Sequence, residues 1–315
     1  GGVRVQRPGA GVCRPHRRRA VTHLLVDPFT VPYMQRALWV AVLLGVLAGL
    51  VGVHVALRRL AFMADTFTHT VFPGMAVAFA VGSSIALGAL LAGLASALVF
   101  TVLDRSRRVT SDAALAVVLT SFFAVGVIVV SRTERYTADL TGLLFGRILT
   151  VDRAQVLEVA AVLAVVALVL AATHKELVLR AFDPEAARAA GYRIGAIDLL
   201  VNVLIVLVVV AAARAVGTLL TVALLITPAA AAKVVARSVG GMYVVAAAVG
   251  AGGGWLGLAV AYRASIDHDL RLAPGATIVL ATTVLFAAVL GGRGLVRLAA
   301  QASRRRAAAA GVAAG

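Results

Sequence analysis

Asp65 and His69 are the two side chains whose types and spacing best suit metal chemistry. They lie four residues apart in the stretch FMADTFTHTVFPG, residues 62–74, so on a helix they share one face. A carboxylate and an imidazole are ligands that suit zinc or manganese. On spacing alone, Asp65 could instead cap a helix and His69 could be an interfacial polar residue. Ionisable groups in or beside a membrane span are rare and usually functional, which favours a metal-binding pair.

The longest polar interval between apolar blocks, residues 174–195, predicts a short helix that could dock on another protein. Asp183 can act as its N-cap with Pro184 in the first helical position, and Gly191 can end it. An ordinary loop helix is the alternative. Within the predicted helix 183–191, the residues assigned to partner docking are Asp183, Pro184, Glu185, Ala186, Arg188, Ala190 and Gly191.

Two other groups of residues are weaker candidates for binding a cation. Asp267, His268 and Asp269 could receive one from a delivery protein at an outer entrance, although adjacent residues rarely chelate one ion together and a solvated loop is the commoner case. His54 lies inside an apolar block and is better explained as a packed or hydrogen-bonded histidine. Cys13 is the only cysteine, which excludes a disulfide framework and a thiolate site.

The composition places these residues in a membrane protein. Hydrophobic residues make up 61% of the 315 residues and charged residues 14%, whereas a soluble domain is about half apolar and a quarter charged. The net charge of +16 could indicate nucleic-acid binding. The basic residues of the chain, however, cluster in connectors between long apolar runs, which is the positive-inside pattern of membrane proteins. We therefore expect lipid contact and no nucleic acid.

Nine apolar blocks follow one another, each near the ~20 residues that a bilayer core needs. They are residues 37–57, 67–82, 85–103, 112–131, 154–173, 197–213, 216–236, 243–262 and 274–292. The predicted fold is all-α, a polytopic transmembrane bundle of about eight or nine spans. Block 136–150 is too polar to span and should lie in the interface or form a short outer helix. The glycines at 250–254 should allow tight helix packing or local unwinding.

The charges of the connectors predict a topology with the carboxyl terminus inside, because connectors on that side carry most of the Lys and Arg residues. Nine spans then place the amino terminus outside, which conflicts with the basic run at 14–19. We expect residues 1–20 to come from upstream sequence, with synthesis starting near Val21. The predicted domains are a disordered or non-native segment 1–36, a membrane domain 37–292 and a cytoplasmic basic tail 293–315.

Four motifs in this order resemble the membrane subunits of zinc, manganese and iron ABC importers. They are FMADTFTHTVFPG at 62–74, AFDPEAARAAG at 181–191 continuing into Asp198-Leu-Leu, LLTVALLITPAAAAK at 219–233 and LAPGATIVL at 272–280. The resemblance covers about residues 34–292. The chain departs from the family pattern at Ala64, where glycine is usual, at Thr66 and Thr68, and at Lys233.

The resemblance implies a permease homodimer in the bacterial cytoplasmic membrane, with the ion path between the two copies. Two copies of a separate ABC ATPase would dock on helix 183–191, and an extracytoplasmic solute-binding protein would deliver the ion. Asp65 and His69 match positions that this family uses to hold the metal in transit. Zinc or manganese would be the substrate, with no permanently bound cofactor. No enzyme activity is expected, because the sequence has no GxxxxGK[ST] phosphate loop.

Three alternatives stay open at this point. An iron-chelate or cobalamin-type ABC permease would transport a metal that has no vacancy for an Asp/His pair. A secondary metal transporter would work without an ATPase, but the sequence shows no inverted repeat and does show a docking helix. A membrane anchor without transport would leave the intramembrane Asp65 and His69 unexplained.

Overall fold

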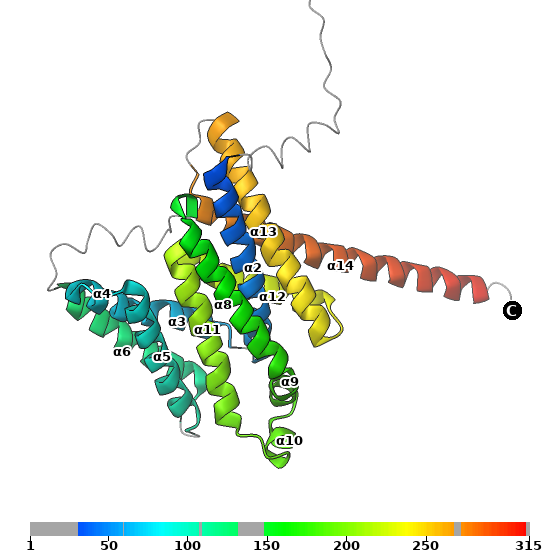
Figure 1. Ribbon diagram of the computed structural model, residues 1–315. Helices are drawn as coiled ribbons and strands as arrows, with labels where there is room; N and C mark the ends of the chain where they lie inside the picture. The colour runs from blue at the N-terminus through cyan, green and yellow to red at the C-terminus, as the bar shows by residue number, and fades with distance from the viewer. Residues whose placement is uncertain (1–30, 59, 107–108, 132–147, 268–271, 313–315) are drawn as a thin grey trace, which may run out of the picture.

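The computed structural model describes residues 31–58, 60–106, 109–131, 148–267 and 272–312. Within these ranges the regular structure is helical, without strands, which confirms the predicted all-α fold (Figure 1). The helices are α2 (Pro32–Arg58), α3 (Phe62–Thr70), α4 (Phe72–Val81), α5 (Ile85–Asp104), α6 (Ser111–Ser131), the 3-10 turn η2 (Ile148–Thr150), α8 (Arg153–Ala172), α9 (His174–Phe182), α10 (Pro184–Ala189), α11 (Ile194–Val216), α12 (Thr218–Val235), α13 (Val239–Asp267) and α14 (Pro274–Val312).

Eight of the nine predicted spans each coincide with one helix, and among the described residues seven helices are long and apolar enough to cross a membrane. The seven are α2, α5, α6, α8, α11, α13 and α14. The apolar part of α12 is shorter, Leu220–Val235. The predicted span 67–82 corresponds to two consecutive helices, α3 and α4, of which α3 begins earlier, at Phe62. A polytopic bundle is therefore confirmed, with two of its predicted spans shortened or broken.

The first described helix, α2, begins at Pro32, inside the segment 1–36 that the sequence predicts to be disordered or non-native. A proline fits the first helical turn, where its missing N–H has no acceptor in any case. Nε of Arg36 donates to the carbonyl oxygen of Pro32 at 3.4 Å and supports this turn. The predictions for residues 1–20, and for all of block 136–150 except the turn η2, fall outside the described residues.

The break between α3 and α4 has its cause in Pro73. A proline has no N–H to donate to the carbonyl four residues earlier, and its ring clashes with that carbonyl. Here the deprived carbonyl is that of His69, which instead accepts the backbone N–H of Val71. The chain resumes as α4 with Pro73 in its first turn. The helix that carries Asp65 and His69 therefore ends directly after His69 and Thr70.

Helices α2 and α11 form the centre of the bundle. In their membrane-spanning segments, 67% of the α2 residues and 56% of the α11 residues are buried. The corresponding fraction is 17–22% in α6, α8 and α14. On one flank α4, α5 and α6 contact one another, and on the other α12, α13 and α14 do so. Figure 1 shows α2, α8 and α11 running between the same two ends of the bundle, with α9 and α10 at one of them. We call this the α10 end.

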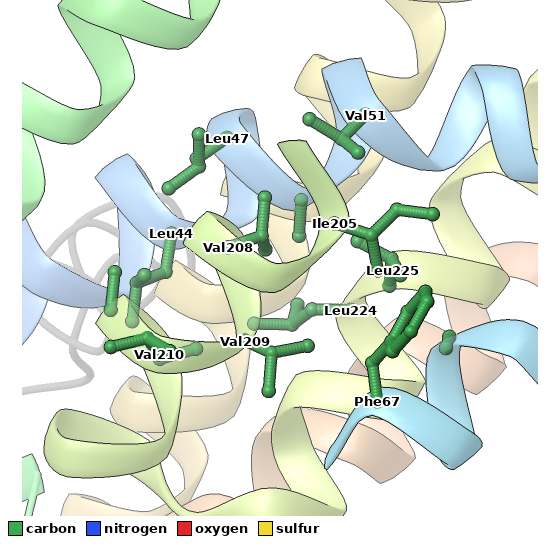
Figure 2. Packing of buried hydrophobic residues seen from close by; sticks show 14 of the residues in the cluster. Leu44, Leu47, Val51, Phe67, Ile205, Val208, Val209, Val210, Leu224 and Leu225 are labelled. Carbon is green, nitrogen blue, oxygen red and sulfur yellow. The ribbon is translucent and has the colours of Figure 1, made fainter. Parts of the chain in front are cut away.

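The core joins α3 to the central helices. Apolar side chains from α2, α3, α11 and α12 meet there, among them Leu44, Phe67, Ile205 and Leu224, all fully buried (Figure 2). The hydroxyls of Thr70 on α3 and Ser96 on α5 are hydrogen-bonded at 2.8 Å, also in the interior. One face of α3 is thus held firmly, and its opposite face is left for other contacts.

Glycines let α2 and α13 approach until their backbones touch. A Cβ added at Gly45 would overlap the backbone of Gly250, and one added at Gly49 would lie 2.8 Å from the carbonyl carbon and oxygen of Ala246. Small residues at such crossings replace the hydrophobic driving force that is missing within a bilayer. The tight packing expected for the glycine run 250–254 is confirmed at Gly250.

We expect Gly49→Val to destabilise the protein, since the new side chain would push α13 away from α2. Overpacking of this kind costs about 1–3 kcal/mol. Thermal unfolding of the detergent-solubilised protein measures the effect. Gly291→Val on α14 is the matched control, because a Cβ there meets nothing within 4 Å. Equal unfolding temperatures for the two variants would show that the α2–α13 contact is loose.

Candidate metal site and docking helix

Asp65 and His69 lie beside each other on α3, as their spacing predicts. Nε2 of His69 is 3.7 Å from Oδ1 of Asp65, and each side chain is 39% exposed. Neighbouring ligand atoms around a tetrahedral zinc ion, with bonds of about 2.0–2.2 Å, are ~3.3 Å apart. Small side-chain rotations would therefore bring both atoms onto one ion. The pair has the composition and spacing of two ligands of a divalent transition metal.

The surroundings of α3 orient this pair away from the core. Phe67 and Thr70 point inward from the same helix. The ring of Phe123 on α6 stands edge-on to the imidazole of His69, with ring centroids 6.2 Å apart and an interplanar angle of 88°. The hydroxyl of Thr68 donates to the backbone carbonyl oxygen of Asp65 at 2.6 Å, not to its carboxylate. This threonine, a departure from the family pattern, therefore leaves the carboxylate oriented for other contacts.

Asp65 and His69 bring together two side chains of the kinds that bind metal ions. Among the described residues, no group of three or more His, Cys, Asp or Glu side chains is placed to hold a metal ion. Half-exposed ionisable groups on an apolar helix are costly against lipid and normally face water, an ion or another polypeptide. The arrangement is suited to brief, incomplete coordination of an ion beside α3.

The predicted docking helix is present as α10, at one end of the bundle (Figure 1). Oδ1 of Asp183 accepts the backbone N–H groups of Glu185 and Ala186 at 3.1 and 2.9 Å, which confirms the predicted N-cap. Gly191 follows the helix with φ = +84°, a left-handed conformation that favours glycine. Ala187 is fully buried.

The outward surface of α10 is formed by the other predicted docking residues. Glu185, Arg188 and Ala190 are exposed, and Ala186 is half-buried. Among the described elements, α10 packs mainly against α9 and α11. A short, well-capped helix that protrudes in this way is available for insertion into a groove of another protein.

Asp198, which follows the second motif, makes contacts that the local sequence does not predict. Its carboxylate binds Arg58 at the end of α2 and Arg180 in α9. The only available signal was a single acidic residue near the start of an apolar helix. Nothing in the local pattern indicates which of the many arginines it would meet.

The remaining candidates have different outcomes. Asp267 is the last residue of α13, and His268 and Asp269 lie outside the described residues, so the outer entrance stays a prediction. His54 is only 2% exposed, and its Nε2 lies 2.6 Å from the hydroxyl oxygen of Tyr243. The interpretation of His54 as a hydrogen-bonded histidine is confirmed.

Comparisons with known proteins agree on one family. The sequence profile of the ABC 3 transport family matches residues 30–292. The manganese import system permease protein ScaB of Streptococcus gordonii is 37% identical over 254 residues, 81% of this chain and 89% of ScaB. The manganese transport system membrane protein MntC of Halalkalibacterium halodurans is 34% identical over 175 residues, 56% of this chain and 60% of MntC.

A solved structure agrees as well. PsaBC from Streptococcus pneumoniae in complex with Fab contains a chain with a TM-score of 0.73 and 32% identity, covering 85% of this chain and 95% of that one. The family profile matches nearly the same residues as the four motifs, and the fold matches that of the solved structure. The resemblance to metal-ion ABC importer permeases is confirmed, and the chain belongs to the ABC 3 transport family.

Proposed function

We propose that the chain is the permease subunit of an ATP-driven importer for a divalent transition-metal ion, zinc or manganese. The observation that carries this proposal is the Asp65–His69 pair, a carboxylate and an imidazole whose Oδ1 and Nε2 atoms are 3.7 Å apart on the outward face of α3. Membership of the ABC 3 transport family supports it. So do the names of two relatives, which are described as parts of manganese transport systems.

A second copy of the chain would complete the ion path. A divalent zinc ion takes four ligands and a manganese ion commonly six, whereas one chain offers the two side chains of Asp65 and His69. In a two-fold dimer the same surface of each copy faces its equivalent, so a second pair would lie opposite the first. A site shared between two surfaces that move apart can release its ion, which a closed cage would not.

The separate ATPase belongs at the α10 end in this proposal, which then faces the cytoplasm of a bacterium. ATP binding would bring the two ATPase copies together, move α10 and switch the side on which the site beside Asp65 and His69 is open. A solute-binding protein would deliver the ion at the opposite end of the bundle, where residues 267–269 remain the candidate entrance. The apolar helices and the basic residues of the connectors support a location in the cytoplasmic membrane.

The alternatives fit less well. A secondary transporter has no use for a capped, protruding helix of the kind formed by residues 183–191, and the family is one of ABC proteins. A permease for chelated metal would carry an ion whose ligands are already supplied, so the Asp65–His69 pair would have no role. The pair favours a bare or weakly hydrated cation.

We expect Asp65→Ala and His69→Ala each to abolish metal accumulation, because each removes half of the ligands that one copy contributes. Uptake of manganese and of zinc is measured by elemental analysis of cells that produce the chain with its ATPase and binding protein. Immunoblots of the membrane fraction verify that the variants are inserted.

Asp112→Ala is the control for this experiment. It also removes a carboxylate, but from an exposed position in the first turn of α6, and we expect normal accumulation. If Asp65→Ala and His69→Ala both accumulate zinc and manganese at the wild-type rate, the pair has a structural role and the proposed ion path is wrong.

We expect the double variant Ala186→Asp and Ala190→Asp to lose its ATPase, because two added carboxylates would be desolvated in the groove that receives α10. Co-purification of the ATPase with the tagged chain measures the loss. Ala113→Asp, which places a carboxylate at an exposed alanine of α6, serves as the control. An ATPase that still co-purifies with the double variant would argue against docking through α10.

A further inference from the structure

We propose that Asp198 is a coupling residue: its carboxylate connects the segment that docks the ATPase to the helix that precedes the metal pair. Movement of α10 would reach α3 through this single side chain. The inference rests on the proposed function and assigns to it a residue that acts at a distance from both the ion and the ATPase. Asp198 is thus a positioning residue and not a ligand.

The contacts of Asp198 engage both oxygens of its carboxylate. Oδ1 accepts Nη2 of Arg58 at 2.7 Å and Nε of Arg180 at 3.1 Å, and Oδ2 accepts Nη2 of Arg180 at 3.1 Å. The side chains are little exposed: 13% for Asp198, 11% for Arg58 and 23% for Arg180. A two-pronged guanidinium–carboxylate contact away from bulk water is strong and fixes direction as well as distance.

The two arginines lie on short paths to the two functional sites. Arg180 is in the last turn of α9, and the next helix along the chain is α10, capped by Asp183. Arg58 is the last residue of α2, and the next helix is α3, which carries Asp65 and His69. Only three residues separate each arginine from the next helix. A flexible connector would therefore absorb little of a movement of α10.

Helix α11 carries the carboxylate that both arginines bind, so the ends of α2 and α9 are held together at its start. Asp198 lies near its beginning, and more than half of its span segment is buried in the bundle. The end of α5 rests on the same place: a Cβ added at Gly195 would overlap the guanidinium of Arg105. The ends of α2, α5 and α9 thus gather around the first turns of α11.

A permanent structural clamp would use the same contacts, so the test must separate coupling from stability. The purified complex of chain and ATPase is reconstituted in liposomes with the binding protein, and metal uptake per ATP hydrolysed is measured. Asp198→Asn removes both ion pairs. Arg180→Gln removes only the arm to α9 and keeps the Arg58–Asp198 pair. Arg180→Lys keeps the positive charge but cannot contact both carboxylate oxygens through two nitrogens as Arg180 does.

We expect Asp198→Asn and Arg180→Gln to retain the ATPase but to lower metal uptake per ATP by about tenfold, within the usual range of coupling between sites. Arg180→Lys should fall in between. Metal uptake per ATP in the double variant Asp198→Asn/Arg180→Gln should be no lower than in Asp198→Asn alone, because both changes interrupt the same connection. Glu158→Gln is the control. It removes the ion pair in which Nη1 of Arg214 contacts both carboxylate oxygens of Glu158 at 2.9 Å, and it should leave the ratio unchanged.

A wild-type ratio in both Asp198→Asn and Arg180→Gln would overturn the inference. Uptake and ATPase association that fall in parallel would do the same, because they indicate a structural clamp. If Asp198→Asn does not reach the membrane, Arg180→Gln decides alone. If the wild-type chain itself neither binds an ATPase nor carries metal, the proposed function fails, and that result is distinct from a failure of Asp198.

Discussion

An ionisable pair on an apolar helix is costly unless it meets water, an ion or another polypeptide, and the arrangement around α3 follows from this constraint. Phe67 and Thr70 bind one face of the helix to the core, which leaves the face of Asp65 and His69 turned outward. Pro73 ends the helix just beyond that pair, because it deprives the carbonyl of His69 of its usual donor. The pair is therefore held in place without being buried.

A fixed scaffold is needed if a sparse ligand set is to work. Gly45 and Gly250 let α2 and α13 touch along their backbones, and α2 with α11 forms the most buried part of the bundle. Rigid neighbours restrict where α3 can go, so a change of state would move the whole helix and not a single side chain. In the proposed dimer, the Asp65–His69 pairs of the two copies could then close on an ion and part again.

The α10 end shows how a signal from outside the membrane could enter this scaffold. Asp183 caps a protruding helix in which Ala187 is fully buried. Behind it, Asp198 binds arginines from α9 and α2 with one carboxylate. Charge, which is expensive inside a membrane, is concentrated here at the end of the bundle, where it can be paired and where a soluble partner can reach it.

Local features were determined by the sequence itself. The spacing of Asp65 and His69, the cap at Asp183, the left-handed Gly191 and the all-α membrane fold all depend on neighbours within one or two helical turns. The break at Val71 was missed although its cause, Pro73, is local, because the apolar run continues through it. The start of α2 at Pro32 was missed because residues 32–36 are not continuously apolar.

Contacts between distant segments were decided by the tertiary structure alone. Arg58 and Asp198 are 140 positions apart, and His54 and Tyr243 are 189 apart. A bundle of apolar helices can pack in many registers that bury similar area. The sequence around a single carboxylate does not indicate which arginine will pair with it. Only the packing of α2 against α11, set by the shapes of many small side chains together, brought Arg58 to Asp198.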